Sequence, residues 1–152
     1  MDLKKIMFVC TGNTCRSPMA EALAQKEIEK EALDIEVTSR GIAVYFPSGA
    51  NEYAYQAMEE YKIDLSNHIS RQLEPRDIED SDIILTMTNQ HKQYLHLHFP
   101  NHQEKIFTLK EFVKEVGDVE DPFGGKLQEY KSCAKKLEQL IKKTLDEIRQ
   151  NV

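Results

Sequence analysis

The sequence contains no apolar run that approaches the roughly 18 residues of a membrane-spanning helix, and no signal-peptide pattern opens it. It also lacks an excess of basic residues, because 26 aspartates and glutamates outnumber 20 lysines and arginines. This balance argues against broad binding to nucleic acid or to an anionic membrane surface. The three cysteines are an odd number, which does not suit a secreted disulfide framework. We therefore expect a cytoplasmic protein that binds neither nucleic acid nor membrane.

What is present suits a globular chain. Of the 152 residues, 40% are hydrophobic and 30% are charged, a composition that can bury one substantial core. We expect a single domain over residues 1–152. Short apolar runs predict four strands, and apolar residues at helical spacing predict four helices. The predicted strands are KKIMFVC, IEVTSRG, SDIILTMT and EKIFTL. The first predicted helix begins near Ser17, and the other three comprise residues 51–61, 89–99 and 126–149.

Strands and helices alternate along the chain. This order predicts an α/β fold of three layers, in which a central parallel four-stranded sheet carries helices on both faces. Ser17 can cap the first helix, and Pro18 suits the first helical position.

The stretch VCTGNTCRSP, residues 9–18, joins the first predicted strand to the first predicted helix. Ligands of parallel sheets bind beyond the carboxyl ends of the strands. Gly12 and Asn13 can turn several backbone N–H groups inward, and the following helix adds the positive end of its dipole. Arg16 can bind two phosphoryl oxygens at once, and the same positive field favours the nucleophilic thiolate form of Cys10. The loop therefore suits phosphoryl transfer through a phosphocysteine.

Cys10, followed by five residues and then by Arg16 and Ser17, resembles the catalytic loop of the low-molecular-weight protein tyrosine phosphatase family. The preceding strand, the following SPMAEAL and a DPFGG sequence at residues 121–125 strengthen the resemblance, which covers nearly the whole chain. It implies that Cys10 attacks phosphorus, that Arg16 holds the phosphoryl group and that Asp121 protonates the leaving group. No cofactor and no metal is implied.

Asp118 and Glu120 are the neighbours that compete with Asp121 for the role of acid. Pro122 favours Asp121, because it biases the preceding backbone towards an extended conformation and so helps to fix one carboxylate.

The family resemblance also implies a set of supporting residues. Asn13, Ser17, Ser39 and His68 match positions that shape the loop in relatives. Relatives with a cysteine beside the arginine form a disulfide on oxidation, so we expect a Cys10–Cys15 disulfide after treatment with peroxide. The residues expected to contact the substrate are Thr11, Gly12, Asn13, Thr14, Cys15 and Phe123.

Two departures from the usual pattern of tyrosine phosphatases concern the substrate. Thr14 stands where those enzymes carry a larger aliphatic residue, and Phe123 is followed by glycines rather than by a second aromatic residue. CTGNTCRS together with DPFGG resembles the protein arginine phosphatase branch of the family. Arginine-phosphorylated proteins are then the expected partners, and Thr14 and Asp121 can accept hydrogen bonds from a guanidinium. Tyr45 or Phe46 is expected to supply an aromatic wall, since Ala43 cannot.

Three other functions stay open. A tyrosine phosphatase is the first alternative, and a thiol-dependent arsenate reductase is the second. The arsenate reductases need further cysteines in the middle of the chain, and residues 82–101 contain none. A sugar-transport phosphocarrier would lack Arg16 and Asp121. We expect the protein to be a monomer.

Overall fold

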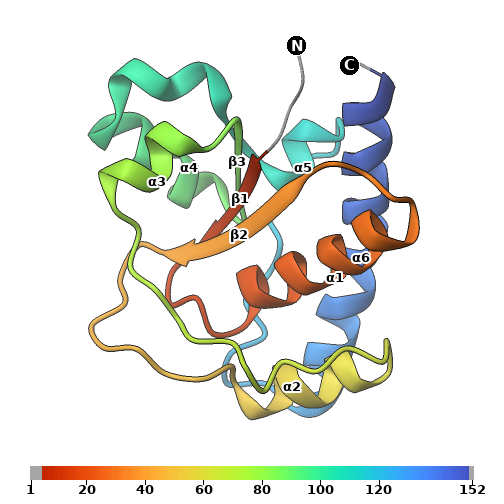
Figure 1. The fold of residues 1–152 in the computed structure, drawn as a ribbon. Helices are drawn as coiled ribbons and strands as arrows, with labels where there is room; N and C mark the ends of the chain where they lie inside the picture. The colour runs from red at the N-terminus through yellow and green to blue at the C-terminus, as the bar shows by residue number, and fades with distance from the viewer. Residues whose placement is uncertain (1–4, 151–152) are drawn as a thin grey trace.

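The structure is a computed structural model that describes residues 5–150. Its four strands form one parallel sheet in the order β2-β1-β3-β4 (Figure 1). This result confirms the predicted α/β fold. The strands are β1 (Lys5–Cys10), β2 (Glu36–Gly41), β3 (Ile83–Thr86) and β4 (Ile106–Thr108).

Strand β1 is central and contacts β2 on one side and β3 on the other. Cys10 pairs with Gly41 at the end of the β1–β2 ladder, so the segment after β1 leaves the carboxyl edge of the sheet. The chain moves from β1 to β2 and then returns past β1 to β3. The strand order therefore reverses beside β1, and a parallel sheet forms its ligand-binding crevice at such a reversal.

Four helices match the predicted ones, and three shorter helices were not predicted. Patterns of apolar residues need two or more turns to be recognisable, and the short helices span only four to six residues. The matched helices are α1 (Arg16–Lys30), α2 (Glu52–Glu59), α4 (Asn89–His98) and α6 (Leu127–Gln150). The unpredicted ones are α3 (Pro75–Asp80), η1 (Pro100–Lys105) and α5 (Leu109–Phe112).

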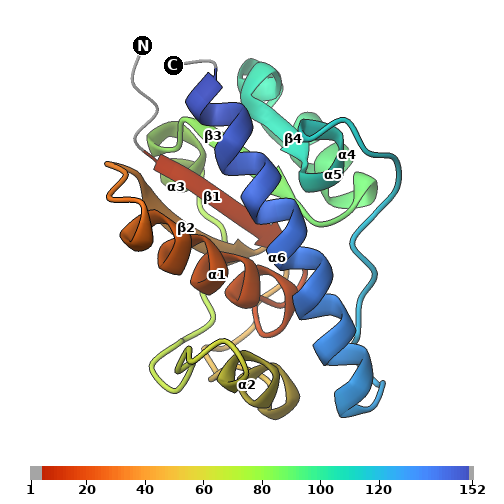
Figure 2. The ribbon, with the colours of Figure 1, turned by 90° about the vertical axis from the view of Figure 1, so that its right-hand side faces the viewer.

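Each face of the sheet is covered by helices (Figures 1 and 2). Alternate residues of β1 point to opposite faces, so Ile6 and Phe8 enter one apolar core while Met7 and Val9 enter the other. The larger core includes residues of α1, α2 and α6, and the smaller one includes Ile78 of α3 and Leu95 of α4. This packing fixes β1 and α1, and therefore both ends of the loop between them.

The predicted cap of the first helix is wrong. Helix α1 begins at Arg16, its N-cap residue is Cys15, and no side chain makes a cap hydrogen bond there. Ser17 lies inside the first turn, and its hydroxyl group faces Cys10 and Asn13 instead. The first turn of α1 thus makes hydrogen bonds to the loop that precedes it rather than to its own backbone.

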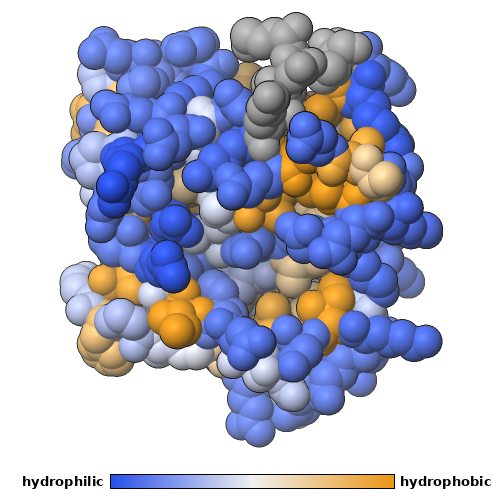
Figure 3. Space-filling view, viewed as in Figure 1, coloured by the Kyte–Doolittle hydropathy of each residue, from blue (hydrophilic) through white to orange (hydrophobic). Residues whose placement is uncertain are grey.

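Polar and charged residues cover much of the face shown in Figure 3. Some apolar atoms gather at its lower left, over the segment that follows β2. Across residues 5–150, no helix is both long enough and apolar enough to cross a membrane.

Candidate active site

A left-handed turn at Asn13 and two backbone hydrogen bonds hold the loop of residues 11–15 in place. Asn13 has a φ of 57°, in the left-handed region that asparagine tolerates better than most residues. The carbonyl group of Thr11 accepts the N–H of Ala43 at 3.0 Å, and the carbonyl group of Thr14 accepts the N–H of Asn51 at 2.9 Å. Gly12 does not adopt a positive φ, so the left-handed turn within the loop is made by Asn13.

The glycine that the loop does require is Gly41, at the end of β2. A Cβ atom at this position would lie 2.6 Å from Val44 Cγ2 and 2.7 Å from the carbonyl oxygen of Thr11. Only glycine lets β2 end this close to the catalytic loop. Sequence reasoning missed Gly41, because the contact joins segments that are distant in sequence.

Cys10 lies at the base of the loop, and only 3% of its surface is exposed. Its Sγ accepts the backbone N–H of Asn13 at 3.3 Å and lies 2.8 Å from the hydroxyl oxygen of Ser17. Two donors therefore converge on the sulfur, an arrangement that suits a thiolate nucleophile.

Asn13 contacts the other three predicted supporting residues, Ser17 and Ser39 through its side chain and His68 through its backbone. Its Nδ2 donates to the hydroxyl oxygens of Ser17 at 2.8 Å and of Ser39 at 3.0 Å. Because the Ser17 oxygen already accepts this hydrogen bond, its own hydrogen is free to point at Cys10. His68 donates from Nε2 to the backbone carbonyl group of Asn13 at 2.8 Å, which supports the strained turn. The structure thus brings together all four residues, as the family resemblance implied.

Two further residues complete this network, and both were missed. The hydroxyl group of Ser39 donates to Glu21 at 2.5 Å, and the backbone N–H of Arg71 donates to Asn13 Oδ1 at 3.0 Å. Glu21 lies one helical turn after Ser17, so its position on α1 could have indicated it. Nothing in the sequence around Arg71 indicates its contact.

Arg16 connects the loop with the segment that carries the predicted acid. It is 5% exposed, its Nη1 donates to the carbonyl oxygen of Val119 at 2.9 Å, and its Nη2 lies 3.5 Å from Asp121 Oδ2. The other oxygen of Asp121 accepts the N–H of Phe123 at 3.0 Å. Asp118 instead accepts the N–H of Asn89 at the start of α4. The carboxylate of Asp121 is thus the one held beside the arginine.

These residues surround a cavity of about 240 Å³ beyond the carboxyl end of β1. Every residue predicted to act in catalysis or in substrate contact lines it, and Asp118 and Glu120 do not. The lining residues are Cys10, Thr11, Gly12, Asn13, Thr14, Cys15, Arg16, Asp121 and Phe123.

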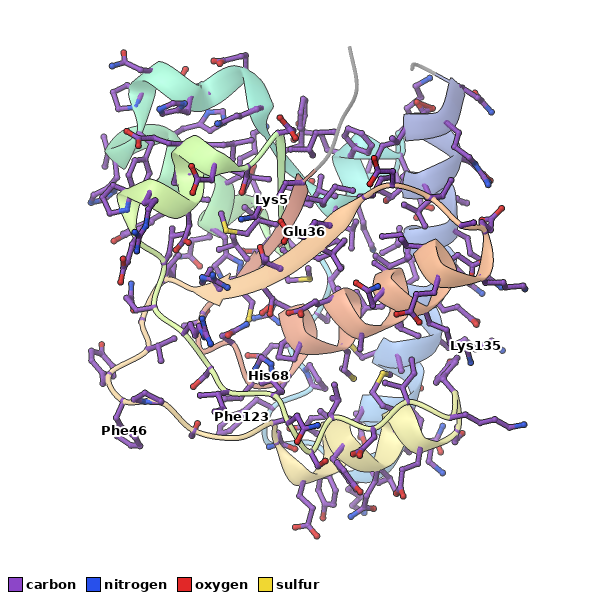
Figure 4. All side chains as sticks on the ribbon, in the orientation of Figure 1. Lys5, Glu36, Phe46, His68, Phe123 and Lys135 are labelled. Carbon is purple, nitrogen blue, oxygen red and sulfur yellow. The ribbon has the colours of Figure 1, made fainter. Side chains whose placement is uncertain are left out.

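Tyr45 and Phe46 do not supply the expected aromatic wall. Both are exposed and line a separate groove with Arg40 and Ile69. Figure 4 shows Phe46 projecting outward from the loop after β2, well apart from Phe123. Among residues 5–150, Phe123 is therefore the one aromatic residue that lines the cavity.

The other two cysteines are buried thiols, of which Cys15 lines the cavity and Cys133 does not. Burial raises the pKa of Cys15, whose Sγ lies 3.8 Å from Thr14 Oγ1 and 3.9 Å from the hydroxyl oxygen of Tyr130. Burial also raises the pKa of Cys133 to about 12. All three cysteines are free, and residues 5–150 contain no group of three potential ligands suited to a metal ion.

The fold and this cavity define a class of protein. A sequence model described as low molecular weight phosphotyrosine protein phosphatase matches residues 5–152. The chain belongs to this family of cysteine-dependent phosphatases.

Particular relatives narrow the comparison. A protein-arginine-phosphatase of Bacillus subtilis is 43% identical over 147 residues, which cover 96% of this chain and 97% of the relative. A low molecular weight protein-tyrosine-phosphatase of Staphylococcus aureus, PtpB, is 40% identical over 142 residues, which cover 93% of this chain and 97% of the relative. A solved structure of the YwlE arginine phosphatase, a cysteine-to-serine mutant with a phosphorylated active-site serine, has a TM-score of 0.91 and 42% identity. That match covers 95% of each chain.

Proposed function

We propose that the protein is a protein arginine phosphatase, which hydrolyses the P–N bond of phosphoarginine in proteins through a phosphocysteine intermediate. The observation that carries the proposal is the cavity itself. It has Cys10 and Arg16 at its base, and Thr14, Asp121 and a single aromatic ring at its mouth. The names of the Bacillus subtilis relative and of the YwlE structure support this substrate.

In the first step, Cys10 Sγ attacks phosphorus while the P–N bond breaks. Arg16 and the backbone N–H groups of the loop stabilise the charge on the phosphoryl oxygens. The leaving guanidine nitrogen takes up a proton, and Asp121 is the acid in position to give it. Its carboxyl group lies at the edge of the same cavity as the sulfur.

In the second step, a water molecule attacks the phosphocysteine and the S–P bond breaks. Asp121, now a carboxylate, accepts the proton of this water, and inorganic phosphate leaves. The hydroxyl group of Ser17 stabilises the departing thiolate of Cys10, since it lies 2.8 Å from the sulfur. The enzyme then returns to its starting state.

The mouth of the cavity supports a guanidinium better than a phenol. Thr14 offers a hydroxyl oxygen and Asp121 the carbonyl oxygen of its carboxyl group, and both accept hydrogen bonds from a guanidinium. Phe123 is 72% exposed and can stack on a planar group from one side. The following Gly124, with a φ of 87° and no atom within 4 Å of a Cβ built there, provides no second wall.

A tyrosine phosphatase is the second candidate. Phe123 can stack on a phenol ring as well, and the Staphylococcus aureus relative bears the name of a tyrosine phosphatase. The cytoplasmic location, the monomeric state and the single domain remain predictions.

Release of inorganic phosphate from an arginine-phosphorylated protein tests the proposal. The wild-type enzyme should release phosphate, and acid-free mass spectrometry of a rapidly quenched reaction should locate the phosphoryl group on Cys10. Phosphate release without a phosphorylated Cys10 would contradict the mechanism, and no release would contradict the substrate.

A further inference from the structure

His91 is a buried histidine that touches the catalytic loop without lining its cavity. It lies in the first turn of α4, and 5% of its surface is exposed. Its Nε2 lies 2.9 Å from the hydroxyl oxygen of Thr11, the residue after the proposed nucleophile. Its Nδ1 is the only buried side-chain nitrogen or oxygen of residues 5–150 that has no hydrogen-bond partner. The two ring nitrogens therefore stand in unlike environments.

The surroundings keep this ring neutral at pH 7. Burial and the guanidinium of Arg16 lower the pKa of His91 to about 4, although the carboxylates of Asp118 and Asp121 act in the opposite direction. A neutral imidazole carries one proton, on either Nδ1 or Nε2. A buried N–H group without an acceptor is rarer than a buried acceptor without a donor. The proton therefore belongs on Nε2, where the oxygen of Thr11 accepts it.

The position of this proton determines what Thr11 presents to a ligand. When Nε2–H donates to the Thr11 oxygen, the hydroxyl hydrogen of Thr11 is free to point into the cavity that this residue lines beside Cys10. There it can donate to a phosphoryl oxygen, a charge-assisted hydrogen bond. With the proton on Nδ1, the Thr11 hydroxyl would donate to Nε2 and present only lone pairs to the anion.

We propose that His91 is a positioning residue whose Nε2–H tautomer makes the Thr11 hydroxyl group a hydrogen-bond donor towards the anion in the cavity. His91 touches no reacting atom and acts through Thr11. This inference rests on the proposed function, because it requires the loop to bind a phosphoryl group.

Direct titration with inorganic phosphate, followed by calorimetry, tests the connection between the two residues. Thr11→Val should weaken phosphate binding about 10-fold, the loss of one hydrogen bond to a charged group. His91→Leu keeps the Thr11 hydroxyl group but no longer orients it, so this variant should weaken phosphate binding by less, about fivefold. The double variant should bind phosphate no more weakly than Thr11→Val alone, because His91 acts only through the Thr11 hydroxyl group. An additive loss of about 50-fold would contradict the proposal.

Two matched variants separate positioning from packing. His91→Gln places an amide N–H group near the position of Nε2 and should restore phosphate binding to within about threefold of wild type. His98→Leu, on the exposed face of the same helix, should leave it unchanged. If His91→Leu bound phosphate as tightly as wild type while His91→Gln did not, His91 would only fill space, and the proposal would be overturned.

The tautomer can be measured on the wild-type protein, so the test survives a variant that fails to fold. Nitrogen-15 NMR at pH 7 should show a protonated Nε2 and an unprotonated Nδ1 on His91. A proton on Nδ1, or on both nitrogens, would overturn the proposal. Neither measurement requires turnover, so a wild-type protein that binds phosphate but hydrolyses no phosphoarginine would contradict the proposed function alone.

Discussion

Arg16 Nη2 lies 3.5 Å from Asp121 Oδ2 in the lining of the cavity, while Nη1 of the same guanidinium donates to the carbonyl oxygen of Val119. The arginine that we expect to hold the phosphoryl group thus also fixes the segment that carries the acid. The side chain of Asp121 is half exposed, and ion pairs of exposed groups add little to stability. We therefore expect this contact to position the carboxylate rather than to stabilise the fold.

Replacing Asp121 with asparagine should slow turnover of phosphoarginine about 10²–10⁴-fold, because an amide cannot protonate the leaving nitrogen. Steady-state kinetics measures the change. Asp118→Asn is the matched control, since Asp118 lies three residues away and does not line the cavity. The assignment of the acid would be wrong if Asp118→Asn caused the larger loss.

Replacing Cys10 with serine should abolish turnover while the fold and the binding of inorganic phosphate persist. The hydroxyl group is a far weaker nucleophile than a thiolate, but the loop donors and Arg16 remain in place. Calorimetric titration with phosphate and circular dichroism check the two halves of this expectation. Cys133→Ser should retain activity, because Cys133 does not line the cavity.

Peroxide should inactivate the enzyme reversibly through a Cys10–Cys15 disulfide, which forms when Cys15 attacks a sulfenic acid on Cys10 and releases water. Thiol reductant should restore activity. Cys15→Ser should turn this reversible loss into a permanent one, whereas Cys133→Ser should leave it reversible, because Cys15 lines the cavity beside Cys10 and Cys133 does not. Mass spectrometry that finds no such crosslink in oxidised wild-type protein would refute the proposal.

The stability of the protein should depend on pH through His91. Folding lowers the pKa of His91 from 6.5 to about 4. Between these two pH values the unfolded chain therefore binds a proton that the folded chain does not bind. The free energy of unfolding therefore falls as the pH is lowered through the window, by about 2 kcal/mol between pH 7 and pH 5. Urea unfolding at the two pH values should show this contribution in wild type and in His98→Leu. Its persistence in His91→Leu would contradict the assignment.

Most of the fold could be predicted because its elements have strong local patterns. Continuous apolar runs mark β1 and β3, which are buried on both faces, and α6 repeats apolar residues over 24 residues. Helices α3 and α5 begin instead at capping boxes, at Glu74 and at Thr108, and are too short to show a periodic pattern.

The residues that line the cavity could be predicted because a single loop supplies most of them. The residues that sequence reasoning missed come from other elements: Glu21 from α1, Gly41 from β2, Arg71 from the segment before α3, and His91 from α4. Glu21 lies one turn after Ser17 on the same helix, but the contacts of the other three depend on how the parallel strands and their crossovers assemble, which no local spacing encodes. The cap at Ser17 was wrong for a related reason. Local propensity favoured a capping hydroxyl, but the side chain bonds to Cys10 and Asn13 instead.

Thr14 should determine the choice between phosphoarginine and phosphotyrosine. Thr14→Ile removes the hydroxyl group and adds an apolar wall, which costs a guanidinium roughly 1–3 kcal/mol for an unmade hydrogen bond and favours a phenol. The variant should lose kcat/KM on phosphoarginine and gain it on phosphotyrosine, while its affinity for inorganic phosphate barely changes. Thr14→Ser, which keeps the hydroxyl group, should retain the wild-type preference. An equal loss on both substrates would show that Thr14 does not discriminate.

The most direct test of the central claim compares the wild-type enzyme on two peptides of one sequence, one with phosphoarginine and one with phosphotyrosine at the same position. We predict a higher kcat/KM for the phosphoarginine peptide, because Thr14 and Asp121 offer the acceptors that a guanidinium needs and Phe123 stands alone as an aromatic wall. A higher kcat/KM for the phosphotyrosine peptide would contradict the account and identify the protein as a tyrosine phosphatase.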